Sequence, residues 1–223
     1  MIPLFKPYMP RMTEIQNILD SGKLAYGSYT KEFEEKLKNY FNTPYLIVTS
    51  TFESAILVAI TTLGIEPNEN IIASPMACLA STQPYLSKGI KVYWADVDPN
   101  TGTLNPDSVR KRINSKTKAI VHNHFCGYPG YVEEINSIGR EFGIPVIDDG
   151  IECFGSEYKG MLIGNCGTDV TVFSLSAIRF CNCIDGGVVI FKDKLLYERS
   201  LLIRDYGIDR SQFRDKMWEI LCD

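Results

Sequence analysis

Short apolar runs alternate along almost the whole chain with segments whose apolar positions recur at helical spacing. Most of the runs are nearly continuous in Val and Ile, which is typical of strands covered on both faces of a sheet. They lie at residues 45–50, 70–74, 91–97, 118–125, 145–149, 169–175 and 186–191. The helical segments lie at about residues 53–63, 79–88, 106–113, 131–142 and 193–204. This alternation predicts an α/β fold with a mostly parallel central sheet covered by helices on both faces.

The N-terminal segment EIQNILDSGKLAYGSYTKEFEEKLKNYF predicts two helices around a loop of Gly, Ser and Tyr. One later helix start is well marked, because Asn105, Pro106 and Asp107 offer an N-cap, a proline at the first helical position and an acid in the first turn. No internal repeat or low-complexity linker interrupts the pattern. Residues 1–223 are therefore predicted to form a single domain.

The composition is that of a globular protein, with 45% hydrophobic and 22% charged residues. A net charge of -4 argues against a nucleic-acid partner, which needs a basic face. No signal peptide is visible and no apolar run is long enough to span a bilayer, so we expect a cytoplasmic protein without a membrane partner. The seven cysteines include no CxxC pair and are expected to be reduced thiols, mostly buried.

Polar and small residues gather at the carboxyl ends of four predicted strands, the edge at which parallel sheets bind ligands. The four stretches are TSTFES (49–54), SPMACLAS (74–81), DDGIEC (148–153) and SLSAIR (174–179). A ligand site is therefore expected where these stretches meet.

Several longer stretches carry a family resemblance. They read YGSYTKEFEEKLKNYF, LGIEPNENIIASP, VYWADVDPNTGTLNPDSV, VIDDGIECFGSEYKGMLIGNCGTDVTVFSLS, DGGVVIFKD and IRDYG. In this order they resemble the DegT/DnrJ/EryC1/StrS family of sugar aminotransferases, which are pyridoxal phosphate (PLP) enzymes of fold type I. The resemblance implies the large domain of that fold, without the family's C-terminal small domain. The apolar surface left uncovered implies a homodimer.

The resemblance also implies which residues hold the cofactor. Asp149 takes the place of the aspartate that pairs with the protonated pyridine nitrogen and keeps the ring an electron sink. Ser174 takes the place of a serine that reaches the phosphate. The alternatives are a strand-end cap for Asp149 and a core hydroxyl for Ser174.

The phosphate-binding turn departs from the family pattern of Ser-Gly-Thr opening a helix. Ser50 is retained as a cofactor-binding position, but Phe52 replaces the glycine and Glu53 replaces the threonine. At an effective dielectric of 20, unit charges about 4 Å apart interact by roughly 4 kcal/mol. That repulsion exceeds the roughly 0.3–1 kcal/mol that a helix N-terminus contributes. We expect Ser50 and Glu53 to form a capping box that fills the turn from within.

Three further positions depart from the family. Cys78 replaces a residue that stacks on the ring, and Glu152 replaces a glutamine near its phenolic oxygen. Arg179 stands where the family has the lysine that forms the Schiff base. A guanidinium stays protonated and has no free lone pair, so it can neither attack the cofactor nor act as the base. We expect Arg179 to neutralise Asp149, Glu152 or Glu53.

These features predict a degenerate, truncated homologue of a nucleotide-sugar aminotransferase, without transaminase activity and without covalent PLP. A nucleotide sugar remains the expected ligand. One alternative is an active PLP-dependent aminotransferase or dehydratase-like enzyme. Another is a metal-binding protein, because His122, His124 and Cys126 alternate along one predicted strand and would face the same side. The preferred hypothesis, a degenerate aminotransferase homologue, includes no metal site.

Overall fold

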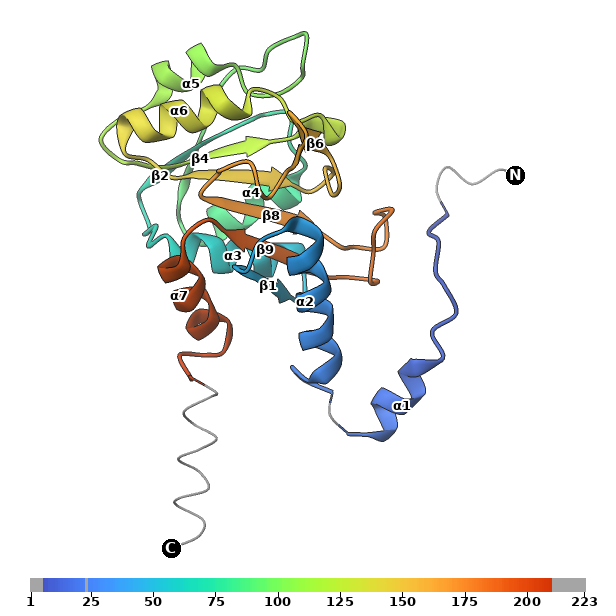
Figure 1. Ribbon diagram of the computed structural model, residues 1–223. Helices are drawn as coiled ribbons and strands as arrows, with labels where there is room; N and C mark the ends of the chain where they lie inside the picture. Colours follow the sequence, from blue (N-terminus) through green and yellow to red (C-terminus); the bar gives the residue numbers. More distant parts are fainter. Residues whose placement is uncertain (1–5, 23, 210–223) are drawn as a thin grey trace, which may run out of the picture.

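The computed structural model describes residues 6–22 and 24–209 of the 223-residue chain, and its described part contains one large sheet (Figure 1). The sheet has seven strands in the order β1-β9-β8-β5-β4-β2-β3. Their bounds are β1 Leu46–Thr49, β2 Asn70–Ala73, β3 Lys91–Trp94, β4 Thr117–Asn123, β5 Val146–Gly150, β8 Val170–Ser174 and β9 Gly187–Phe191. All seven predicted strands are therefore confirmed, each within a few residues of its predicted ends.

Strand β9 runs antiparallel to its neighbours β1 and β8, while the other pairs in the sheet are parallel. The remaining strands consequently share one direction, and their carboxyl ends meet at one edge. The predicted α/β fold with a mostly parallel sheet is confirmed.

Helices cover both faces of this sheet, as the strand pattern predicts. Their bounds are α1 Glu14–Asp20, α2 Ser28–Phe41, α3 Phe52–Thr62, α4 Leu79–Ser87, α5 Pro106–Arg112, α6 Val132–Phe142 and α7 Lys194–Arg204. Successive residues of one strand pack into hydrophobic clusters on opposite faces of the sheet. In β4, Ile120 packs with the cluster under α5 and α6, and Val121 packs with the cluster under α3 and α4. The predicted cap of α5 is also present, with the Asn105 side chain accepting a hydrogen bond from the Ser108 N–H at 3.1 Å.

Two features of the fold were not predicted. Strand β3 lies at the edge of the sheet and is largely exposed, with Tyr93 and Trp94 41% and 44% accessible. A short hairpin, β6 (Glu157–Tyr158) and β7 (Met161–Leu162), turns through Lys159 and Gly160. Both turn residues have positive φ, 51° and 78°, as a two-residue hairpin turn requires.

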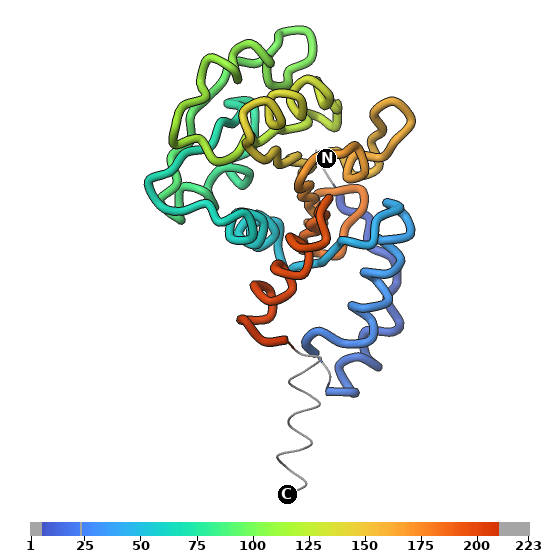
Figure 2. The backbone as a smooth tube through the Cα atoms, turned by 60° about the vertical axis from the view of Figure 1, so that its left-hand side comes forward, coloured from blue at the N-terminus to red at the C-terminus, as the bar shows by residue number. Residues whose placement is uncertain are grey.

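Glu34 of α2 is a buried carboxylate that connects three elements distant in the sequence. Its Oε1 accepts hydrogen bonds from the Val48 backbone N–H at 2.9 Å and from Nη1 of Arg204 at 2.7 Å. Its Oε2 accepts from the Tyr26 hydroxyl at 2.5 Å, and burial together with Glu34 raises the pKa of Tyr26 to about 12. The ion pair therefore links α7 to α2, and Figure 2 shows the blue first part and the red last part of the described chain together in the lower part of the view.

In the described part of the chain, no helix is both long and apolar enough to cross a membrane.

Candidate functional site at the carboxyl edge of the sheet

The residues that follow β2, β4, β5 and β8 line two adjoining hollows at the carboxyl edge of the sheet. One, of about 350 Å³, is bordered by the segment 75–78 and by Asn123, Phe125, Ile151 and Glu152. The other, of about 210 Å³, shares Ile151 and Glu152 and extends to Ser174 and Arg179. The structure thus brings together the strand ends at which the sequence predicts a site.

Asp149 lies at the bottom of this region, 1% exposed, near the end of β5. Its Oδ2 accepts a hydrogen bond at 2.8 Å from Nδ2 of Asn123, its register partner on β4. Its Oδ1 accepts from the Ile151 backbone N–H at 3.2 Å. Burial raises the pKa of Asp149, while the Ser81 and Asn123 side chains oppose that rise. The sequence analysis does not identify Asn123 and Ser81 as site residues. Asn123 could have been identified, because it is a polar residue at the end of a strand.

Arg179 lies in the turn after β8 with its side chain 16% exposed. Its Nη1 is 3.3 Å from Oε1 of Glu152, so the predicted pairing with a carboxylate of the cleft is confirmed, with Glu152 as the partner. The second oxygen of Glu152 accepts the backbone N–H of Cys126 at 2.9 Å. Within the described residues, the buried Nε of Arg179 has no hydrogen-bond partner. The guanidinium therefore has one buried N–H without a partner among these residues, which a ligand would reach after the side chain moves.

Ser174 ends β8 and is 3% exposed, and its Oγ accepts the Ser176 backbone N–H at 3.3 Å. It borders the same hollow as Arg179. Cys78, the N-cap residue of α4, is exposed and borders the other hollow with Glu152. Of the positions that the resemblance connects with the cofactor, Ser174 thus borders one hollow, Cys78 borders the other and Glu152 borders both.

The predicted capping box at the start of α3 is wrong. The N-cap residue is Thr51, whose Oγ1 accepts the Ser54 N–H at 3.0 Å. Thr51 has extended backbone angles (φ -146°, ψ 165°), so the helix begins one residue later than the Ser50–Glu53 spacing requires. Ser50 and Glu53 are both exposed, and Phe52 is buried in the core. The turn is therefore not filled by Glu53.

This difference can be measured through stability. Replacing Thr51 by alanine removes the acceptor for the Ser54 N–H and should lower the free energy of unfolding by about 1 kcal/mol. The matched change Ser50→Ala should alter it by less than about 0.5 kcal/mol, because that hydroxyl is exposed outside the first turn. Urea denaturation of both variants checks the prediction. Equal losses would contradict the cap assigned to Thr51.

The predicted grouping of His122, His124 and Cys126 is wrong in one member. Strand β4 ends at Asn123, and Cys126 lies in a short 3-10 turn with φ 52°. Its alternation with the histidines is therefore lost, and Cys126 is exposed while both histidines are fully buried. The group of possible metal ligands found among the described residues consists of His122, His124 and Asp148.

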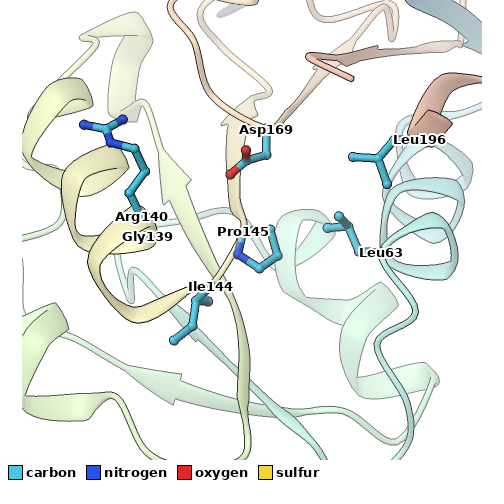
Figure 3. Close-up of a pocket in the computed structure, with 8 residues that line it drawn as sticks. Leu63, Gly139, Arg140, Ile144, Pro145, Asp169 and Leu196 are labelled. Atoms are coloured by element: carbon cyan, nitrogen blue, oxygen red, sulfur yellow. The ribbon is translucent and has the colours of Figure 1, made fainter. Parts of the chain in front are cut away.

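Another hollow, of about 290 Å³, lies at the opposite edge of the sheet (Figure 3). Leu63, Ile144, Pro145 and Leu196 contribute apolar walls, and Asp169 is a carboxylate within it. Oδ2 of Asp169 already accepts the backbone N–H of Val146 at 2.9 Å, so this carboxylate supports the start of β5. The carboxyl edge remains the better candidate site.

Comparison with known proteins agrees with this geometry. The model of the DegT/DnrJ/EryC1/StrS aminotransferase family matches residues 9–222. The chain belongs to this family. It is 28% identical over 215 residues to the uncharacterized protein MJ1066 of Methanocaldococcus jannaschii, and the match covers 96% of this chain and 55% of MJ1066.

Solved structures of sugar aminotransferases share the fold. CalS13 of Micromonospora echinospora, a sugar aminotransferase, has 28% identity and a TM-score of 0.88, with 95% of this chain and 59% of CalS13 covered. DesI, crystallised in the presence of its TDP-sugar product, has 26% identity and a TM-score of 0.82, with 88% of this chain and 50% of DesI covered. The chain thus spans between half and three-fifths of the length of these relatives.

The residues of the site do not fit covalent attachment of the PLP of the DegT/DnrJ/EryC1/StrS family. Among residues 6–22 and 24–209, those that line the two hollows at the carboxyl edge include no lysine. Arg179, at the position that the resemblance gives to the lysine, is paired with Glu152 and has no free lone pair. These residues therefore do not support a covalent bond between PLP and position 179.

Proposed function

We propose that this member of the DegT/DnrJ/EryC1/StrS family binds a nucleotide sugar but does not transaminate it. The observation that carries the proposal is the Arg179–Glu152 pair at the carboxyl end of β8. Transamination by this family's cofactor needs an amine that can lose its proton, attack the cofactor and later carry protons on the substrate. A guanidinium can do none of these at accessible pH.

The proposed ligand class rests on the relatives and on the site. CalS13 acts on sugars and DesI on a TDP-sugar, according to their structures' descriptions. In this chain, Arg179 supplies a fixed cation with one buried, unpaired N–H at the wall of the hollow. A planar guanidinium in such a place suits a phosphate or carboxylate oxygen better than an ammonium does. Glu152 and Asn123 would then receive or donate the hydrogen bonds of sugar hydroxyls from the adjoining hollow.

The decisive experiment exposes the purified chain to PLP, adds borohydride to trap any Schiff base, and maps modified peptides by mass spectrometry. The segment 170–191 has no lysine that could form a Schiff base, so we expect no lysine anywhere in the chain to carry more pyridoxyl label than a free surface lysine does. Isothermal titration with a TDP-sugar, without PLP, tests the binding half of the proposal. Transfer of an amino group to a keto-sugar nucleotide by the chain would overturn the proposal in favour of an active enzyme. Absence of any nucleotide-sugar binding would refute the ligand class alone.

A further inference from the structure

His122, His124 and Asp148 form a fully buried cluster beside the candidate site, on the other side of the sheet. His122 of β4 and Asp148 of β5 are register partners, and His124 follows two residues after His122. Since side chains of a strand alternate between faces, these three point away from Asn123, which borders the candidate site, and from its register partner Asp149. The three side chains are 0–1% exposed.

The cluster leaves an unusual number of buried polar atoms without hydrogen bonds. The four ring nitrogens of His122 and His124 and the two oxygens of Asp148 have no partner of hydrogen-bond geometry within residues 6–22 and 24–209. Leaving one such group buried and unpaired costs about 1–3 kcal/mol, and an unpaired carboxylate costs more. The contacts of the two histidines with Asp148, at 3.2 and 3.6 Å, lack hydrogen-bond geometry, so a group bound among the three side chains would satisfy these atoms.

The distances within the cluster are those between ligands of one metal ion. Oδ1 of Asp148 lies 3.2 Å from Nε2 of His124 and 3.6 Å from Nδ1 of His122. Zinc binds nitrogen and carboxylate oxygen at about 2.0–2.2 Å, so two ligands of a tetrahedral ion lie roughly 3.3–3.6 Å apart. One ligand atom from each of the three side chains can be chosen so that all lie within 4.8 Å of one another. The two distances to Asp148 already fit a common ion, and a pair of ligand atoms separated by as much as 4.8 Å would have to close by about 1.2 Å.

From this geometry we propose that His122, His124 and Asp148 bind one Zn²⁺ ion that supports the fold between β4 and β5. Two imidazoles and a carboxylate are a ligand set that zinc accepts, and the ion would neutralise Asp148 inside the core. The cluster is closed to solvent, which favours a structural ion over a catalytic one. Thr103 and Gly130 confine the site from outside, because a Cβ atom at Gly130 would lie 2.4 Å from Oγ1 of Thr103 and 2.9 Å from Nε2 of His122.

The competing explanation is a proton instead of an ion, with an imidazolium paired to Asp148. The test therefore measures metal directly on the full chain. Protein stripped with a chelator and dialysed is titrated with ZnCl₂ and its metal content is measured by plasma mass spectrometry. We expect one zinc per chain and a higher melting temperature with zinc than without. A wild-type chain that binds no stoichiometric zinc overturns the proposal, whatever the variants do.

Variants then locate the ion. Asp148→Asn and His122→Gln should each weaken zinc binding by ~100-fold or more, since even the loss of an outer-shell partner typically costs 10–100-fold. Asp149→Asn, the adjacent carboxylate on the opposite face, and Cys126→Ser, the exposed thiol, should leave zinc affinity within about twofold of wild type. Circular dichroism confirms that each variant is folded. Equal zinc affinity in Asp148→Asn and Asp149→Asn would refute the assignment.

Cobalt gives a second readout that does not depend on any variant. Co²⁺ bound by nitrogen and oxygen alone shows visible d–d absorption without a sulfur-to-cobalt charge-transfer band. Since the proposed site has no thiolate, that band should be absent from the Co²⁺-loaded wild-type chain. Its presence would assign the ion to the chain's cysteines and overturn the proposal.

Discussion

Replacing Arg179 by lysine should give the chain the covalent attachment of PLP that the wild type lacks. The side chain at this position comes from the turn after β8 and its terminal nitrogen reaches Glu152 at the wall of the hollow. A lysine there can lose its proton and attack the cofactor's aldehyde, whereas the guanidinium cannot. After borohydride treatment we expect at least a tenfold gain in pyridoxyl label on the peptide that contains position 179, relative to wild type. Peptide mapping by mass spectrometry measures it.

The matched control for this variant places a lysine two residues earlier. Ala177 lies in the same turn but is not among the residues that border the hollow, so Ala177→Lys should label no more than the lysines elsewhere on the surface. Equal labelling of the two variants would mean that the site does not orient the cofactor. Absence of label in Arg179→Lys would indicate that Phe52 and Glu53, at the altered phosphate turn, exclude the cofactor by themselves.

The strands of the sheet were predictable because a strand that is buried on both faces is a nearly continuous run of apolar residues. Strands such as β2 and β9 are continuous apolar runs, and all residues of both are buried. The order of the strands and the reversed direction of β9 follow from long-range packing, which no local pattern records. The edge strand β3 was predicted as a strand, but its exposure depends on its place in the sheet. The hairpin of β6 and β7 was missed because each strand has only two residues.

The site was predictable to the extent that it depends on strand ends. Asp149, Glu152, Ser174 and Arg179 lie at the edge that the sequence pattern indicates. The sequence predicts three carboxylates as possible partners of Arg179, because which of them it contacts depends on the side-chain conformations in the cleft. The N-cap of α3 at Thr51 depends on backbone angles. The presence of Asp148, and not Cys126, beside the two histidines depends on the register between β4 and β5. Neither can be read from spacing alone.

Replacing Glu34 by alanine should cost about 3 kcal/mol of stability, because it takes from a largely buried arginine the closer of its two carboxylate partners, Glu34 and Asp205. The Glu34 and Arg204 side chains are only 4% and 13% exposed and lie 2.7 Å apart. The same change removes the acceptor of the Val48 N–H and of the Tyr26 hydroxyl. Since a domain of this kind is stable by about 5–15 kcal/mol, the loss would be a large part of the total. Guanidinium denaturation at neutral pH measures it.

The neighbouring residue of the same helix supplies the control. Glu35 is 66% exposed and its ion pair with Lys38 spans 2.9 Å at the surface, so Glu35→Ala should cost about 1 kcal/mol or less. Glu34→Gln separates charge from hydrogen bonding, because the amide oxygen still accepts the Val48 N–H while the charge that balances Arg204 is lost. Asp205, 3.4 Å from Nε of Arg204, would compensate in part, so the stability lost in Glu34→Gln should lie between the losses in Glu34→Ala and Glu35→Ala.

A loss in Glu34→Ala no larger than that in Glu35→Ala would show that the buried pair does not hold α7 against α2. Helix α7 would then be anchored by its contacts with α3, β9 and β1.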